Sequence, residues 1–156
     1  MCAEALTTDL LRLRAQQLGF DLIGVTPADP LQAADFFARW VALGFAGAMG
    51  YLERGIDRRR DIARLVPGAR SVICLGMHYP IVDDRDPNSI RSVDGESPKG
   101  RVAGYALGDD YHDIVQARAQ SVLEEVQRID PTSKGRCFVD PAPVLERELG
   151  QRAGLG

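Results

Sequence analysis

The sequence predicts an α+β domain in which helices flank a small sheet. Amphipathic helical patterns over residues 3–18 and 110–129 alternate with short apolar runs typical of strands, over residues 20–25 and 70–77. The chain of 156 residues suits one domain, since domains commonly have about 100–150 residues. A hydrophobic content of 45% is ordinary for a globular protein, so a wholly disordered chain is excluded.

The first half is expected to form a helix, a strand, a second helix and a short third one. The first helix covers residues 3–18 and ends at Gly19, and the strand follows at residues 20–25. The apolar stripe of this helix comprises Leu6, Leu10, Leu13 and Leu18. The second helix covers residues 31–43, with Asp29 as its cap, and residues 61–65 form the short one. The second helix has an apolar side formed by Phe36, Phe37, Trp40 and Leu43.

The second half is expected to contain the clearest strand and the strongest helix. Residues 70–77 include a continuous apolar run, typical of a central strand covered on both faces. Residues 110–129 are helical, and residues 136–140 form another short strand that ends in an acid. A last helix begins at Pro143 or Val144.

Residues 80–100 form a long polar segment rich in proline, glycine and aspartate. Loops of this length are often functional lids or binding loops. A surface insertion without a function explains the composition equally well, so both interpretations stay open.

Charge and cysteine content exclude several kinds of site. A net charge of −3 gives no basic surface for tight nucleic-acid binding by the chain as a whole. The three cysteines, Cys2, Cys74 and Cys137, contain no CxxC pair, so they do not predict a zinc or iron–sulfur site. Cys74 is expected to be a buried, inert thiol. Reduced thiols, together with the lack of a signal or membrane-spanning segment, predict a cytoplasmic protein.

Two segments are candidates for chemistry. Residues 101–112 combine small residues with a helix start, which would admit a flat ligand and favour anionic groups. Asp109 or Asp110 would alternatively just cap that helix. Asp140 ends an apolar run before a proline-stiffened turn, where it could serve as a general acid or cap the next helix. The two histidines, His78 and His112, are expected to be structural.

Three ordered motifs resemble those of the epoxyqueuosine reductase family, and the similarity covers nearly the whole chain. The first spans residues 49–73 and includes Arg59, and the second is Gly100-Arg101-Val102-Ala103 with Tyr105, Gly108, Asp110, Tyr111 and His112. The third is Phe138-Val139-Asp140-Pro141-Ala142-Pro143-Val144-Leu145-Glu146-Arg147, followed by Arg152-Ala153-Gly154-Leu155-Gly156.

The resemblance implies reduction of epoxyqueuosine to queuosine in tRNA, using cobalamin and two 4Fe–4S clusters. It implies a fold similar to nitroreductases and cobalamin-processing proteins. Asp140 matches the family's proposed proton donor and Arg59 a cobalamin-contacting arginine. Ala103 occupies a cobalamin-contacting position, and Tyr105, Asp110 and Asp140 are further candidates for lining the cobalamin pocket.

We therefore expect residues 1–156 to be one cobalamin-binding N-terminal domain, cut off before an iron–sulfur ferredoxin-like domain. The chain lacks the cluster-binding cysteines, so it is expected to bind cobalamin as a monomer but to be inactive alone. The tRNA would be the partner of the full-length protein. The alternatives are a cobalamin-binding or trafficking module without redox chemistry, and a non-catalytic tRNA-interaction domain, which the net charge disfavours.

Overall fold

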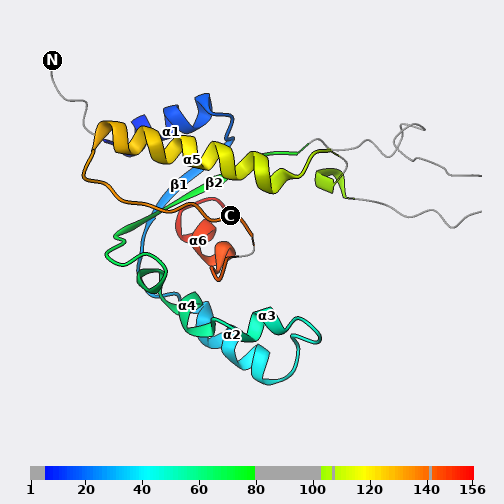
Figure 1. The fold of residues 1–156 in the computed structure, drawn as a ribbon. Helices are drawn as coiled ribbons and strands as arrows, with labels where there is room; N and C mark the ends of the chain where they lie inside the picture. The colour runs from blue at the N-terminus through cyan, green and yellow to red at the C-terminus, as the bar shows by residue number, and fades with distance from the viewer. Residues whose placement is uncertain (1–5, 80–102, 107, 141) are drawn as a thin grey trace, which may run out of the picture.

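The computed structural model describes residues 6–79, 103–106, 108–140 and 142–156. These form an α+β arrangement, as the sequence predicts (Figure 1). In chain order the main elements are α1 (Thr8–Gln17), β1 (Leu22–Pro27), α2 (Ala33–Ala42), α3 (Gly50–Glu53), α4 (Ile56–Arg60), β2 (Ser71–Gly76), α5 (Tyr111–Ile129) and α6 (Glu146–Arg152). Short 3-10 turns occur at Ile62–Arg64 and Gly104–Ala106. The polar segment 80–100 lies outside the described residues, as does the predicted start of the first helix.

The two strands pair in antiparallel orientation, with Leu22 opposite Gly76 and Pro27 opposite Ser71. Helices α1 and α5 lie on one face of this sheet and α6 lies on the other (Figure 1). Alternate residues of β2 therefore enter two separate cores, which explains its continuous apolar run.

The strand predicted for residues 136–140 is wrong. This segment connects α5 to α6 without forming a ladder with β1 or β2. Its apolar residues 137–139 are half-buried, and Arg136 lies over the Phe138 ring at 5.0 Å. The apolar run at residues 137–139 thus reflects the partial burial of a connecting segment rather than backbone pairing.

The first core lies between α1, α5 and the sheet. Its buried residues are Leu11, Ala15, Phe20, Ile23, Val122 and Val126. The predicted apolar stripe of α1 is partly wrong, because Leu6 and Leu13 are 40% and 51% exposed. Helix α1 instead packs against β1 and α5 through Leu11 and Ala15, which lie four residues apart and therefore on one helix face.

The second core is built around α6. Its buried residues are Leu31, Ile62 and Leu149, and Val72 and Cys74 of β2 pack against them. Burial raises the pKa of the Cys74 thiol, as expected for a packing residue rather than a nucleophile.

Helix α2 is capped from the opposite end of the chain. The predicted cap, Asp29, is wrong, because Gln32 is the N-cap residue of α2 and no side chain at that position caps the helix. The Glu148 carboxylate of α6 instead accepts hydrogen bonds from the backbone N–H groups of residues 32 and 33, at 2.9 and 2.8 Å. Arg152 pairs with Glu148 at 2.5 Å and donates to the Pro30 carbonyl at 3.0 Å. The C-terminal helix therefore fixes where α2 begins.

The predicted apolar side of α2 is largely exposed, which corrects the expectation that it faces a core. Phe36 and Leu43 are 63% and 71% exposed. The helix contacts α4 instead, with Ala34 as its one buried residue and Phe37 beneath the Arg59 guanidinium.

Replacing Gly24 by alanine should destabilise the domain by about 1–3 kcal/mol, the usual cost of overpacking. A Cβ at this position would lie 2.4 Å from the Ala153 carbonyl oxygen, so β1 and the end of α6 would have to separate. Urea unfolding followed by circular dichroism measures the loss.

Gly150→Ala is the matched control, because Gly150 lies within α6 and its Cβ would meet nothing within 4 Å. This variant should be as stable as the wild type or up to about 1 kcal/mol more stable, given the higher helix propensity of alanine. Equal stability of both variants would contradict the close approach at Gly24.

Candidate active site

Asp140 occupies an unusual backbone conformation in the connection between α5 and α6. Its φ of 41° makes it the sole non-glycine residue with a positive φ in the described ranges. Aspartate tolerates this left-handed region better than most residues, but the conformation still costs energy. Such residues gather at functional sites, where the surrounding structure holds them in place. Its side chain is 49% exposed, which leaves the carboxyl accessible to a ligand.

Two side chains from the first turn of α5 reach this carboxyl. The Tyr111 hydroxyl donates a hydrogen bond to Oδ2 of Asp140. Nε2 of His112 lies 3.4 Å from the same oxygen. The phenol and imidazole rings stack with their centroids 4.2 Å apart, so the two contacts are formed together.

Asp110 caps α5 and contacts the ring of His112. Its Oδ1 accepts from the His112 backbone N–H at 2.9 Å, which caps α5, and lies 2.7 Å from Nδ1 of the ring. These hydrogen bonds lower the pKa of Asp110. The structure therefore supports the capping alternative for Asp110 and also connects this residue, through His112, to Asp140.

The titration of the neighbouring groups depends on Asp140. Its hydrogen bond with Tyr111 raises the pKa of that phenol to about 12. The Glu146 carboxyl accepts the backbone N–H of Asp140, while desolvation and then the Asp140 charge raise the pKa of Glu146. The capping alternative for Asp140 is not supported, because no side chain caps α6 and Leu145 stands at its N-cap position.

A row of aromatic rings leads away from this carboxyl. Tyr105 meets Tyr111 edge to face at 5.6 Å, and Tyr79 meets Tyr105 in the same way at 5.8 Å. Ala103 begins the turn that carries Tyr105, and its carbonyl accepts the Ala106 N–H at 2.9 Å. The structure thus brings Tyr105, Asp110 and Asp140 into one cluster, with Ala103 beside it.

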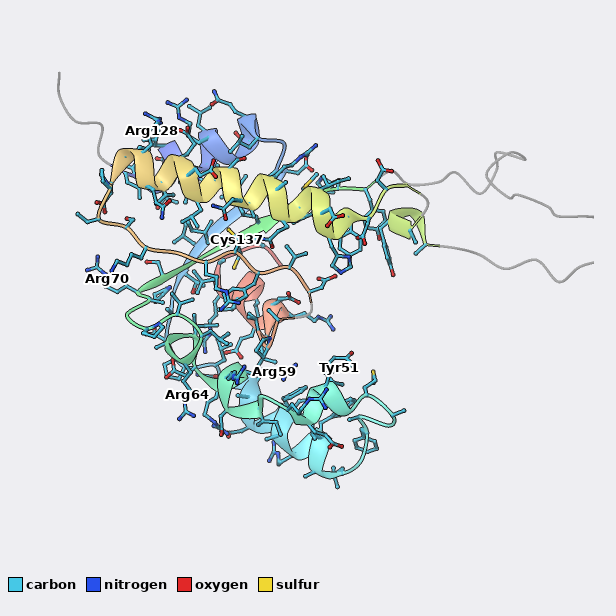
Figure 2. The ribbon with its side chains drawn as sticks, viewed as in Figure 1. Tyr51, Arg59, Arg64, Arg70, Arg128 and Cys137 are labelled. Carbon is cyan, nitrogen blue, oxygen red and sulfur yellow. The ribbon has the colours of Figure 1, made fainter. Side chains whose placement is uncertain are left out.

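Arg59 lies outside this cluster, on α4. It is only 5% exposed, and desolvation lowers its pKa. The guanidinium donates to the Arg54 carbonyl at 3.0 Å and lies 5.0 Å from the Phe37 ring centroid. No carboxylate pairs with it in the described part of the chain. Figure 2 shows Arg59 in the group of α2, α3 and α4, with Tyr51 on the same side of that group.

Arg59 and the segment that follows Asp140 both lie near Gly55. A Cβ on this glycine, whose φ is +86°, would lie 3.6 Å from Nη1 of Arg59 and 3.5 Å from Cβ of Pro143. Arg59 and the turn that follows Asp140 therefore both lie close to the same glycine.

The sequence motifs contain Tyr111, His112 and Glu146, but sequence reasoning assigned none of them a role at this site. His112 was expected to be structural, yet it lies between two carboxyls. The consecutive acid, tyrosine and histidine at the start of a helix are the sequence signal that could have identified it.

Other features of the described residues offer no competing site. An open groove of about 570 Å³ lies beside Glu148 and Arg152, whose charged groups already pair with each other and with the backbone of residues 30–33. Among the described side chains, no three His, Cys, Asp or Glu residues are grouped to hold a metal ion. No described helix is long and apolar enough to cross a membrane.

The chain matches the family model described as epoxyqueuosine reductase QueG, DUF1730, over residues 59–141, which is more than half of its length. It is 35% identical over 154 residues to an epoxyqueuosine reductase of Gloeobacter violaceus, covering 96% of this chain and 44% of that protein. It is 36% identical over 141 residues to one of Pseudomonas aeruginosa, covering 90% of this chain and 38% of that protein. The chain thus spans less than half the length of these relatives.

Two solved structures have a similar fold. A selenomethionine-labelled epoxyqueuosine reductase superposes with a TM-score of 0.78 and 25% identity, over 95% of this chain and 38% of that one. An epoxyqueuosine reductase with an epoxyqueuosine-modified tRNA-Tyr stem loop superposes with a TM-score of 0.75, also at 25% identity and with the same coverage.

Proposed function

Because the chain belongs to the epoxyqueuosine reductase QueG, DUF1730, family, we propose that it forms the cobalamin-binding part of an epoxyqueuosine reductase. This oxidoreductase converts epoxyqueuosine to queuosine in tRNA, and Asp140 supplies a proton to the reaction. The observation that carries the proposal is the left-handed Asp140, held by Tyr111 on one side and by Glu146 on the other.

Arg59 on α4 and the residues beside Asp140 would together hold a bound cobalamin. Arg59 is a buried cation with no carboxylate partner among the described residues, so it retains capacity for an anionic group. Cobalamin contains a phosphodiester, which a guanidinium binds well. Ala103 and Tyr105 would line the same pocket, the former through its small size and the latter through its exposed ring.

The reaction defines what Asp140 must do. Removing an epoxide oxygen as water consumes two electrons and two protons. Reduced cobalamin, when bound, supplies the electrons. The Asp140 carboxyl protonates the departing oxygen, and its O–H bond breaks as the new O–H bond forms. Tyr111 keeps its own proton and orients the carboxyl through Oδ2.

Sustained turnover would need an electron source beyond this chain. Its three cysteines lie far apart in sequence and offer no cluster-binding motif, so we place the 4Fe–4S clusters in another part of the protein. On this proposal, the 156-residue chain binds cobalamin but reduces epoxyqueuosine only when a reductant is supplied. The epoxyqueuosine-containing tRNA would be the substrate both of the complete enzyme and of this chain when a reductant is supplied.

Cobalamin binding tests the proposal most directly. The purified chain should bind cobalamin saturably, with a shift in visible absorbance. Arg59→Met should raise Kd by about 10–100-fold, because it removes charge-assisted hydrogen bonds worth about 1.5–3 kcal/mol. Methionine keeps an apolar stem over the Phe37 ring, which limits the loss of packing.

Arg58→Met is the matched control, since Arg58 lies on the same helix but is exposed, and its Kd should stay within about threefold of the wild type. Circular dichroism verifies that both variants fold. Absence of binding by the folded wild-type chain would contradict the proposal. Binding without epoxide reduction in the presence of a chemical reductant would favour the cobalamin-binding or trafficking alternative.

A further inference from the structure

We propose that His112 is a proton relay that returns a proton to Asp140 after each turnover, with Asp110 fixing the orientation and protonation of its ring. This inference rests on the proposed role of Asp140 as the proton donor. It assigns a chemical task to a histidine that the sequence indicated only as structural.

The protonation of the ring follows from Asp110. Hydrogen bonds from His112 lower the pKa of Asp110, so this carboxylate is ionised at neutral pH and can only accept. Its Oδ1 lies 2.7 Å from Nδ1, which must therefore bear a hydrogen. In the neutral ring Nε2 then has a free lone pair, and in the imidazolium it bears the second proton.

The atom of His112 that gains and loses a proton, Nε2, is the one that faces Asp140. Nε2 lies 3.4 Å from Oδ2 of Asp140, a distance that a small rotation of either side chain would close. Tyr111 donates to the same oxygen and stacks on the imidazole. It therefore keeps the Asp140 carboxyl and the His112 ring close to each other. Because Asp140 raises the pKa of Tyr111 to about 12, the phenol stays a donor and does not compete for the relayed proton.

The relay step transfers one proton from His112 to Asp140. The Nε2–H bond of the imidazolium breaks and an O–H bond forms on the Asp140 carboxylate, which yields neutral imidazole and a neutral carboxyl. A proton from water then restores the imidazolium. This proton adds to Nε2, because Nδ1 keeps its hydrogen toward Asp110. The His112 side chain is 43% exposed, so solvent reaches the ring between turnovers.

The chain contains an internal reference for testing this relay. Its only other histidine, His78, lies 3.4 Å from Asp21 through Nδ1, and its backbone N–H donates to the same carboxylate at 2.8 Å. His78 thus repeats the local aspartate–histidine pair, but no second carboxylate within the described residues faces it.

Nitrogen-15 NMR of the labelled chain, without cobalamin or tRNA, tests the protonation pattern. Long-range ¹H–¹⁵N spectra of the neutral rings should show His112 with its hydrogen on Nδ1. Asp110→Asn should move a measurable fraction of that hydrogen to Nε2 and leave His78 unchanged, whereas Asp21→Asn should affect His78 alone. A wild-type His112 with its hydrogen on Nε2, or one insensitive to Asp110→Asn, would overturn the relay.

Turnover tests the relay itself. With cobalamin, titanium(III) citrate as reductant and an epoxyqueuosine-containing tRNA stem loop, His112→Gln should lower the multiple-turnover rate by about 10–100-fold, within the range for proton transfer. Added imidazole should restore at least part of the rate, which a purely structural defect would not allow. His78→Gln should keep the wild-type rate. A His112→Gln rate within about twofold of the wild type would refute the relay.

Failure of the two hypotheses can be distinguished. If the wild-type chain binds no cobalamin and shows no turnover, the proposed function fails, while the NMR result still decides the protonation of His112. If the wild type turns over and His112→Gln is slow but not rescued by imidazole, the relay fails and the proposed function stands.

Discussion

Asp140→Asn should lower the rate of epoxide reduction by about 10²–10⁴-fold, the usual contribution of a positioned general acid. Cobalamin affinity should stay within about threefold of the wild type. Asparagine tolerates the left-handed backbone at φ 41°, and its amide oxygen can still accept from the Tyr111 hydroxyl. The variant therefore removes the acidic proton with little effect on the local structure. Chromatography of nucleosides from the reacted stem loop measures the rate, with cobalamin and titanium(III) citrate supplied.

Asp109→Asn provides the control for a change of charge. Asp109 is an exposed neighbour of the α5 cap and makes no hydrogen bond or ion pair in the described part of the chain. Its rate should equal that of the wild type. Substantial activity of Asp140→Asn, or an equal loss in both variants, would remove Asp140 from the role of proton donor.

The elements whose patterns are local were predicted well. The 3.6-residue periodicity before Ile129 predicted α5 to within one residue, because Asp110 caps the helix and Val122 and Val126 face one core. The apolar run of β2 was also recognised, since both of its faces are covered by residues packed from the two sides of the sheet.

Features that depend on distant parts of the chain were missed. The cap of α2 comes from Glu148, more than 100 residues further along, so no local pattern could reveal it. The same holds for the exposed face of α2, because its aromatic residues satisfy a helical pattern whether or not another element covers them. The apolar run at residues 137–139 has a similar explanation, since a connection can be half-buried without a partner strand.

The site was predicted as two unconnected parts. Asp110 and Asp140 were each identified as candidates, but the contact that joins their segments runs from Tyr111 to a residue 29 positions away. The positive φ of Asp140 has no sequence signal, because aspartate occurs in ordinary conformations as well. Asp110 is a neighbour of His112 in the sequence, but only the three-dimensional fold shows that the ring also lies near Asp140.

Leu149→Ala should produce the largest loss of stability among the substitutions considered, about 2–5 kcal/mol. Leu149 is 2% exposed and is the largest fully buried side chain among the described residues. It joins the short helix α6 to Leu31 and Ile62 in the second core. A loss of this size is a large fraction of the about 5–15 kcal/mol that stabilises a typical domain. Urea unfolding monitored by circular dichroism should show a lower midpoint with an unchanged slope.

The effect should extend beyond the core, because α6 holds both the cap of α2 and the contact at Asp140. Glu148 bonds the start of α2, and Glu146 accepts the backbone N–H of Asp140. Leu13→Ala is the control, since Leu13 is 51% exposed on α1 and its loss should cost less than about 0.5 kcal/mol. A similar cost for both leucines would contradict the packing of α6. A folded Leu149→Ala chain with unaltered cobalamin affinity would instead show that α6 does not position the ligand site.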